Sequence, residues 1–224
     1  MNEFDIEGLA GGPFGTNAYL VTDGATRKCA IVDPGYEADR VWLPILEARG
    51  LTLEKILCTH GHIDHVTGVA PLLRVRPGTP VLIHAEDEFL LAGGNAQSAA
   101  FLGLPPYEPA RPTDYLVEGA PVGVGRTEFQ VFHVPGHCPG HVALYHHPHL
   151  ISGDVIFAGS IGRTDLPGGN YPLLAASIVE KLLSLGNDVI VYPGHGPMTT
   201  LGEERRSNPF ILEMLRERRR REGP

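Results

Sequence analysis

The chain has few cysteines, no long apolar run and no excess of positive charge. Its three cysteines are irregularly spaced and form no CxxC pair, which does not suggest a disulfide framework and favours a reducing, cytoplasmic location. No apolar run approaches the ~20 residues that cross a membrane, and the acidic N-terminus does not resemble a secretion signal. We therefore expect no membrane partner. The formal net charge of −8 also argues against a nucleic-acid partner, which usually meets a basic surface.

Strand-like and helix-like apolar patterns alternate along the chain. Short apolar runs bounded by turn residues predict strands over 18–21, 29–32, 55–58, 81–84, 128–134, 142–145, 150–151 and 188–192. Helical spacing of apolar residues predicts helices over 37–49, 64–74, 85–91 and 172–185. This mixture predicts a layered α/β architecture.

Three details of this pattern are less regular. Pro44 counts against an uninterrupted first helix, and residues 93–114 indicate either a long surface loop or a short helix between loops. Near the C-terminus we expect one helix at about 208–221, with Asn208 as its cap and Pro209 at its first position. With 224 residues, a single domain spanning 1–224 is the expected organisation.

Residues 59–65 read Thr-His-Gly-His-Ile-Asp-His and contain four side chains that can bind metal. Residues two apart on an extended segment point the same way, so His60 and His62 can reach one ion. Gly61 removes a side chain that would crowd them. Asp64 and His65 follow after the chain turns into a helix and can face a second ion. Such a density of ligands predicts a metal site.

Three further candidate ligands follow predicted strands: His137, Asp154 and His195. Loops at strand ends, held by a rigid sheet, are where sites usually form. Imidazoles and carboxylates suit zinc, iron or manganese, and no thiolate is needed. Seven ligands are enough for two divalent ions, with zinc as the first choice, and the two oxygens of Asp154 could bridge them.

The pattern His60-x-His62-x-Asp64-His65, followed by His137, Asp154 and His195, resembles the metallo-β-lactamase superfamily over almost the whole chain. The resemblance implies a four-layer αββα sandwich with the site at one sheet edge. It also implies the roles of the ligands: one ion is held by His60, His62 and His137, the second by Asp64, His65 and His195, and Asp154 bridges both. Asp33 would support the ligand loop from behind.

Residues 157–165 are similar to those of short, single-domain relatives of hydroxyacylglutathione hydrolase (glyoxalase II). This implies hydrolysis of a thioester, an S-acyl derivative of a small thiol. Bound ions would activate a water and polarise the carbonyl, while Asp64 and Asp154 would act as the catalytic carboxylates that fix the ions and orient the nucleophile. Glyoxalase II carries a C-terminal domain that binds glutathione, whereas 29 residues follow His195 here, so the carrier thiol stays open.

Several other residues have two readings. Arg163 could grip a substrate carboxylate bidentately or form a salt bridge with Asp165. For His141 we expect support of the ligands rather than metal binding, and for His84 a place in the core or at its rim. Cys138, beside a ligand, is expected to be a packing residue.

Two other functions remain open from the sequence. Persulfide dioxygenases also resemble the chain and use a single iron, held by the equivalents of His60, His137 and Asp154, a two-histidine, one-carboxylate set. The other function is that of a non-catalytic metal-binding protein, which the complete ligand set argues against.

Overall fold

The computed structural model describes residues 4–222, and two six-stranded sheets form its centre. The first sheet has the order β1-β2-β3-β4-β5-β6, with strands β1 (Phe4–Gly11), β2 (Thr16–Asp23), β3 (Lys28–Val32), β4 (Thr52–Leu57), β5 (Val81–Ile83) and β6 (Asp114–Tyr115). The second has the order β14-β13-β10-β9-β8-β7, with strands β7 (Pro121–Val124), β8 (Thr127–His133), β9 (Val142–His146), β10 (His149–Gly153), β13 (Ile190–Pro193) and β14 (Thr199–Thr200). A separate two-stranded ribbon consists of β11 (Ile156–Phe157) and β12 (Ser160–Ile161).

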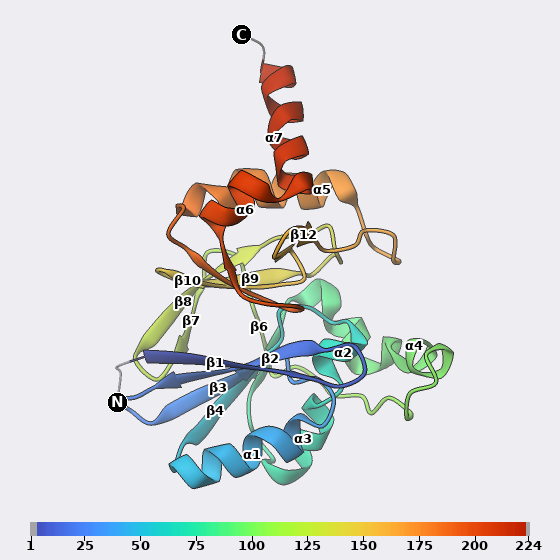
Figure 1. The fold of residues 1–224 in the computed structure, drawn as a ribbon. Coiled ribbons are helices and arrows are strands. Elements are labelled where there is room, and N and C mark those ends of the chain that lie inside the picture. The colour runs from blue at the N-terminus through green and yellow to red at the C-terminus, as the bar shows by residue number, and fades with distance from the viewer. Residues whose placement is uncertain (1–3, 223–224) are drawn as a thin grey trace.

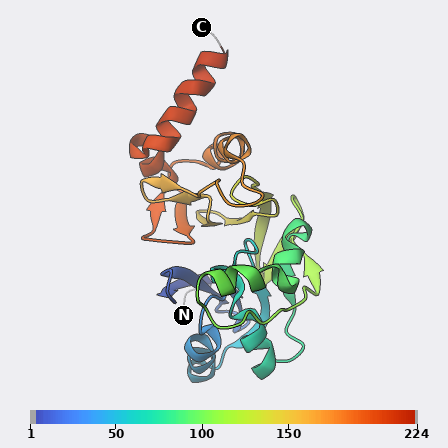
Figure 2. The same ribbon diagram turned by 90° about the vertical axis from the view of Figure 1, so that its right-hand side faces the viewer.

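Helices cover the outer face of each sheet (Figure 1). The first sheet is covered by α1 (Ala38–Arg49) and α3 (Val69–Val75), with α2 (Ile63–Val66), η1 (Ala85–Asp87), η2 (Leu90–Gly94) and α4 (Ala96–Phe101) along one side. The second is covered by α5 (Tyr171–Ala176), η3 (Ser177–Leu182), η4 (Leu183–Leu185), α6 (Leu201–Ser207) and α7 (Pro209–Glu222). The two sheets face each other between these helices, and α7 projects away from the layers in both views (Figures 1 and 2). The expected four-layer αββα sandwich is confirmed.

Three apolar clusters fill the three interfaces between the layers. Leu20 and Ile31 pack with Trp42 between the first sheet and its helices. Their strand neighbours Val21 and Val32 point the other way and pack between the sheets, because successive side chains of a strand alternate between its faces. The third cluster lies between the second sheet and the helices near the C-terminus. The inner strands of each sheet are thus buried on both faces, which explains the continuous apolar runs in the sequence.

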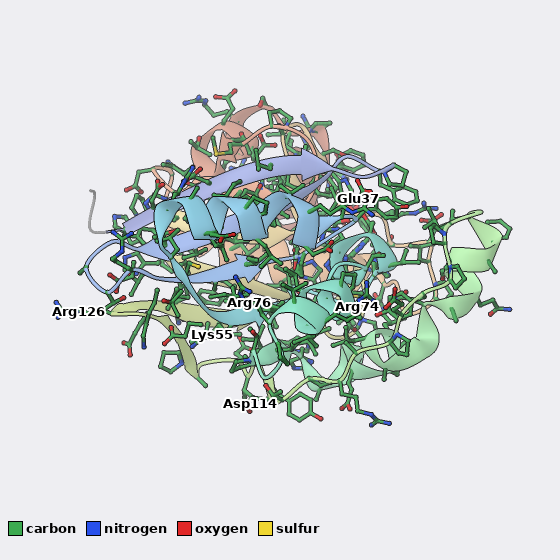
Figure 3. All side chains as sticks on the ribbon, turned by 90° about the horizontal axis from the view of Figure 1, so that it is seen from below. Glu37, Lys55, Arg74, Arg76, Asp114 and Arg126 are labelled. Carbon is green, nitrogen blue, oxygen red and sulfur yellow. The ribbon has the colours of Figure 1, made fainter. Side chains whose placement is uncertain are left out.

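Charged side chains mark the outer surface of the helical layer. Figure 3 shows this face, with α1 crossing in front of the first sheet and Arg74 and Arg76 lying at α3. The guanidinium of Arg74 pairs with Glu108. Over residues 4–222, no helix combines the length and the apolar character that a membrane crossing requires.

The helix expected over 64–74 is not one continuous helix. It consists of two helices, α2 and α3, that meet at Gly68. The amide of Gly68 donates to the carbonyl of Pro34 at 2.8 Å, and a β-carbon on Gly68 would lie 2.3 Å from the carbonyl oxygen of Gly35. The loop after β3 therefore packs directly on this joint, and the helix breaks there.

The other expectations about helices are confirmed in part and corrected in part. Pro44 does not interrupt α1; it is exposed, so the carbonyl one turn earlier can bind water instead. The expected helix over 85–91 is present, since η1, Glu88, Phe89 and η2 follow one another with helical backbone. Of the two possibilities for residues 93–114, α4 confirms the short helix between loops. The helix predicted over 172–185 is present as one continuous helical run of α5, η3 and η4, in which the hydrogen-bond pattern changes from α to π to 3-10. Two helices, α6 and α7, follow His195 where one was expected. Asn208 caps the second of them through its side-chain oxygen, which accepts from the amide of Phe210 at 3.0 Å.

Candidate metal centre

The seven predicted ligands converge at one edge of the sandwich. His60 and His62 follow β4, His137 follows β8, Asp154 follows β10, and His195 follows β13. Hydrogen bonds join the two sheets at this edge: the amide of Asn17 donates to the carbonyl of Gly194 at 2.7 Å. The strand ends of both halves are thereby held side by side.

One group of ligands consists of His60, His62 and His137, whose ligand atoms lie within 4.8 Å of one another. The Nδ1 atom of His62 and the Nε2 atom of His137 are 2.8 Å apart. His137 donates from Nδ1 to the carbonyl of Arg163 at 2.8 Å, which leaves its Nε2 lone pair facing the group. Burial lowers the pKa of His60 well below the usual value and that of His62 to about 4. These rings are therefore neutral, the form that binds metal.

A second group consists of Asp64, His65 and His195. The Oδ2 atom of Asp64 lies 3.2 Å from Nε2 of His195 and 3.4 Å from Nε2 of His65. Burial alone would lower the pKa of His65, but Asp64 and Asp154 outweigh burial and raise this pKa well above its usual value. The carboxylates thus make this place strongly favourable for positive charge.

Asp154 lies between the two groups. Its Oδ1 atom is 3.4 Å from Nε2 of His65, and its Oδ2 atom is 3.5 Å from Nε2 of both His137 and His195. Burial alone would raise the pKa of Asp154, but His65, His137 and His195 together outweigh burial and the pKa falls to about 2. The carboxylate is therefore ionised, and it touches ligands of both groups.

Three of these buried ligand atoms have no hydrogen-bond partner: His60 Nε2, His65 Nε2 and Asp154 Oδ1. Leaving a buried polar group unpaired costs roughly 1–3 kcal/mol, so native proteins rarely do so. Here the unpaired atoms are two imidazole nitrogens and one carboxylate oxygen, all of which can donate an electron pair to a metal, and they lie together among the seven predicted ligands. The residues present therefore fit divalent metal ions, which such a donor set binds.

Asp33 supports two ligands from behind. Its carboxylate accepts hydrogen bonds from the amide of Thr59 at 2.6 Å, from the Thr59 hydroxyl at 2.7 Å and from Nδ1 of His65 at 3.1 Å. The Thr59 hydroxyl also lies 3.0 Å from Nδ1 of His60. These are the contacts that the predicted supporting role requires.

His141 and Arg163 have clear places in the structure. Nε2 of His141 accepts from the amide of Asp154 at 3.0 Å, and its ring stacks on His60 with centroids 4.6 Å apart; it supports Asp154 and is in neither ligand group. The exposed guanidinium of Arg163 binds both carboxylate oxygens of Asp165 at 2.7 Å. The salt bridge is therefore present, and a substrate contact by Arg163 stays a prediction.

Sequence reasoning missed Asp87, which ties the ligand loops together. This fully buried residue accepts hydrogen bonds from the amides of Gly61 at 2.8 Å and Gly140 at 2.7 Å, and from the thiol of Cys138 at 2.9 Å. It also missed Thr16, whose hydroxyl donates to Oδ2 of Asp64 at 2.8 Å. Nothing in the local sequence separates Asp87 from the acidic residues on either side of it.

The expected role of Gly61 needs a correction. A β-carbon at Gly61 would lie 2.8 Å from the β-carbon of Leu90 and 3.0 Å from the carbonyl oxygen of Asp87. The absent side chain therefore makes room for the first residue of η2 and for the backbone at the end of η1, rather than for the imidazoles.

Comparison with known proteins identifies the family. The model of the metallo-beta-lactamase superfamily matches residues 11–195. The chain belongs to this superfamily. The expected resemblance is thereby confirmed, and with it the coarse expectation of a metallo-hydrolase family.

Members of the superfamily with similar sequences or structures cover nearly the whole chain. Hydroxyacylglutathione hydrolase GloC from Haemophilus influenzae is 40% identical, over 88% of this chain and 93% of its own length. The crystal structure of the BLEG-1 B3 metallo-beta-lactamase has a TM-score of 0.85 at 38% identity, covering 92% of this chain and 99% of that chain.

Two further crystal structures are similar to this chain, and one of them holds metal. That of TTHA1623 in a di-iron-bound form has a TM-score of 0.81 at 43% identity, covering 91% of this chain and 99% of that chain. The structure of ETHE1 from Myxococcus xanthus has a TM-score of 0.76 at 28% identity, covering 94% of this chain and 90% of that chain.

Proposed function

We propose that the protein is a dinuclear metal-dependent hydrolase of thioesters, acting on the S-acyl derivative of a small thiol. The observation that carries the proposal is the position of Asp154, whose carboxylate faces His137 of one group and His65 of the other. A carboxylate in this position can bridge two ions. A relative solved in a di-iron-bound form supports two ions, and it makes iron a candidate beside zinc and manganese.

The ligand roles follow from the two groups. His60, His62 and His137 would hold one ion, Asp64, His65 and His195 the second, and Asp154 both. Divalent ions in such a site supply an activated water near neutral pH and polarise the substrate carbonyl. The protein's own part is to hold the ligand side chains at fixed positions. Asp33 accepts a hydrogen bond from His65, and the Thr16 hydroxyl donates to Oδ2 of Asp64, the oxygen that faces His195.

Hydrolysis of a thioester needs little acid catalysis from the remaining side chains, because its leaving group is a thiolate. A thiolate, with a thiol pKa of about 8.5, leaves without strong acid assistance. Beside Asp64 the surface is lined by the side chains of Phe14, Tyr36 and Leu104, against which the apolar part of an acyl group could pack. The naming of a similar protein as a hydroxyacylglutathione hydrolase supports the same class.

A mononuclear iron persulfide dioxygenase is the second candidate, favoured by the presence of His60, His137 and Asp154 in one place. Asp64, His65 and His195 form a further complete group beside them, which a one-iron enzyme does not need. A non-catalytic metal-binding role gives no reason for the buried carboxylate of Asp154 to lie between two groups of ligands. We therefore rank both behind the hydrolase.

Metal analysis and a substrate screen test the proposal. The natively purified protein is expected to hold two ions per chain and to hydrolyse members of an acyl-thiol panel. β-Lactams serve as the comparison class, because one structurally similar protein is named a metallo-beta-lactamase. One iron per chain with oxygen uptake on a persulfide would establish the dioxygenase instead, and a fully metallated protein inert towards every acyl-thiol would overturn the hydrolase.

A further inference from the structure

The loop that carries His195 has few restraints of its own. It reads Pro-Gly-His-Gly-Pro over residues 193–197. The two prolines have no backbone N–H to donate, and the two glycines restrict the backbone less than other residues do. The imidazole of His195 is 28% exposed, whereas that of His65 in the same group of ligands is fully buried. The position of His195 therefore depends on hydrogen bonds from other segments.

The side chain of Asn17, near the start of β2, supplies such hydrogen bonds. Its amide NH₂ group donates to the carbonyl of Pro193 at 2.9 Å and to that of Gly196 at 2.8 Å, on either side of His195. The backbone amide of Asn17 donates to the carbonyl of Gly194 at 2.7 Å. One buried residue thus holds three carbonyls of the loop.

Two neighbours of this asparagine in β2 act on the same group of ligands. The Tyr19 hydroxyl donates to the carbonyl of Pro193 at 2.6 Å, and burial raises the pKa of Tyr19, so this hydroxyl keeps its proton. The Thr16 hydroxyl donates at 2.8 Å to Oδ2 of Asp64, the oxygen 3.2 Å from Nε2 of His195. The start of β2 thus holds two of the three ligands of the second group, one directly and one through its loop.

A different asparagine holds the first group of ligands. The side-chain amide of Asn95 donates to the carbonyl of Gly61 at 2.8 Å and to that of Leu90 at 3.1 Å, and Gly61 lies between His60 and His62. Asn95 is buried as well. Two buried asparagines therefore make matched contacts with backbone carbonyls, one beside each group of ligands.

We infer that Asn17 is a positioning residue for the second group of ligands: it fixes the loop of His195 and thereby sets the affinity for the second ion, but not for the first. Without its side chain, the carbonyl of Gly196 loses its donor, so the loop is free to move and His195 leaves its place beside Asp64. Asn95 serves the first group in the same way. The inference rests on the two-ion centre of the proposed function and does not depend on the substrate.

Titration of the full chain with Zn²⁺ against a competing chelator measures the two affinities. Asn17→Ala is expected to bind one ion as tightly as the unsubstituted protein and the other at least about tenfold more weakly, the lower end of the losses seen when groups behind a metal ligand are removed. Asn95→Ala, the matched variant, is expected to weaken the opposite ion. Tyr19→Phe keeps both side-chain hydrogen bonds of Asn17 and should cause a smaller loss of the same ion as Asn17→Ala.

Ligand variants identify which ion is weakened. His195→Asn removes a ligand of the second group, and adding Asn17→Ala to it should cause no further loss of metal. His62→Asn removes a ligand of the first group, and adding Asn17→Ala to it should weaken the ion that remains. The reverse pattern would overturn the inference, as would equal weakening of both ions by Asn17→Ala, which a merely structural role produces.

Unfolding midpoints measured with a chelator separate positioning from folding. Asn17→Ala and Asn95→Ala should lose similar stability without metal, because both leave backbone carbonyls without a donor. Should Asn17→Ala not fold, Tyr19→Phe must show the same selectivity, or the inference fails. Two ions held with unchanged affinity by Asn17→Ala would overturn the inference alone. One ion per chain in the unsubstituted protein would contradict the two-ion centre, and with it both the inference and the proposed function.

Discussion

The carboxylate of Asp87 accepts a hydrogen bond from the amide of Gly61, 2.8 Å away, and so holds the loop that carries His60 and His62. Its other oxygen accepts from the amide of Gly140, beyond His137. One buried side chain thereby sets the distance between two ligand loops that are far apart in the sequence.

The substitution Asp87→Asn is therefore expected to disturb both loops. The amide NH₂ group would face one of the two backbone donors, and the buried donor left unpaired costs about 1–3 kcal/mol of unfolding free energy. Chemical denaturation measures this loss, and metal affinity should fall by roughly 10–100-fold. Glu88→Gln, an acidic neighbour that pairs with Tyr115 instead, is the control. Equal stability and affinity in both variants would contradict the role of Asp87.

Asp33→Asn tests the support behind His65. Asp33 has a positive φ of 51°, which asparagine tolerates better than most residues, so the backbone is preserved. The variant loses one of the acceptors that bind Thr59 and His65, and we expect metal affinity to fall by roughly 10–100-fold. Metal titration with Asp39→Asn as the control measures the effect. Unchanged affinity would show that Asp33 does not orient the ligands.

Gly194→Ala should damage the metal centre by a steric route. The added β-carbon would lie 2.0 Å from Oδ1 of Asp154 and 2.7 Å from Cε1 of His65, so the Asp154 carboxylate must move. We expect the purified variant to hold fewer ions per chain and to lose most of its hydrolytic activity. Gly123→Ala places its β-carbon no closer than 3.9 Å to any neighbour and should behave as the unsubstituted protein. Full metal content in Gly194→Ala would contradict the geometry of the site.

Removal of the metal should destabilise the protein. A ligand that binds only the folded chain stabilises it by about 2.7 kcal/mol at a concentration 100 times its dissociation constant. A chelator removes this stabilisation and leaves the buried ligand atoms of His60, His65 and Asp154 without a partner. Thermal melting with and without chelator is expected to show a lower midpoint without metal, restored by added Zn²⁺. Asp154→Asn should show a smaller difference. Identical midpoints with and without chelator in the unsubstituted protein would count against a metal centre at these residues.

The sequence predicted the features that depend on local pattern. The four ligands between His60 and His65 are adjacent in the chain, and the continuous apolar runs reflect sheets buried on both faces. Edge strands were harder to predict. β1 is exposed or half-buried along its whole length, and its sequence shows little alternation of apolar and polar residues. The break at Gly68 depends on a contact with Pro34, from another segment, and no local signal reports it.

The sequence by itself determined which donor atoms this protein carries, that they follow the ends of strands, and the superfamily to which the chain belongs. Only the tertiary structure decided which donors face one another, that Asp154 lies between the two groups, and that Asp87, Thr16 and the carbonyl of Arg163 hold the ligands in place. The physical reason is that donor chemistry and strand propensity are properties of short segments. Hydrogen bonds between distant loops exist only after both sheets have packed.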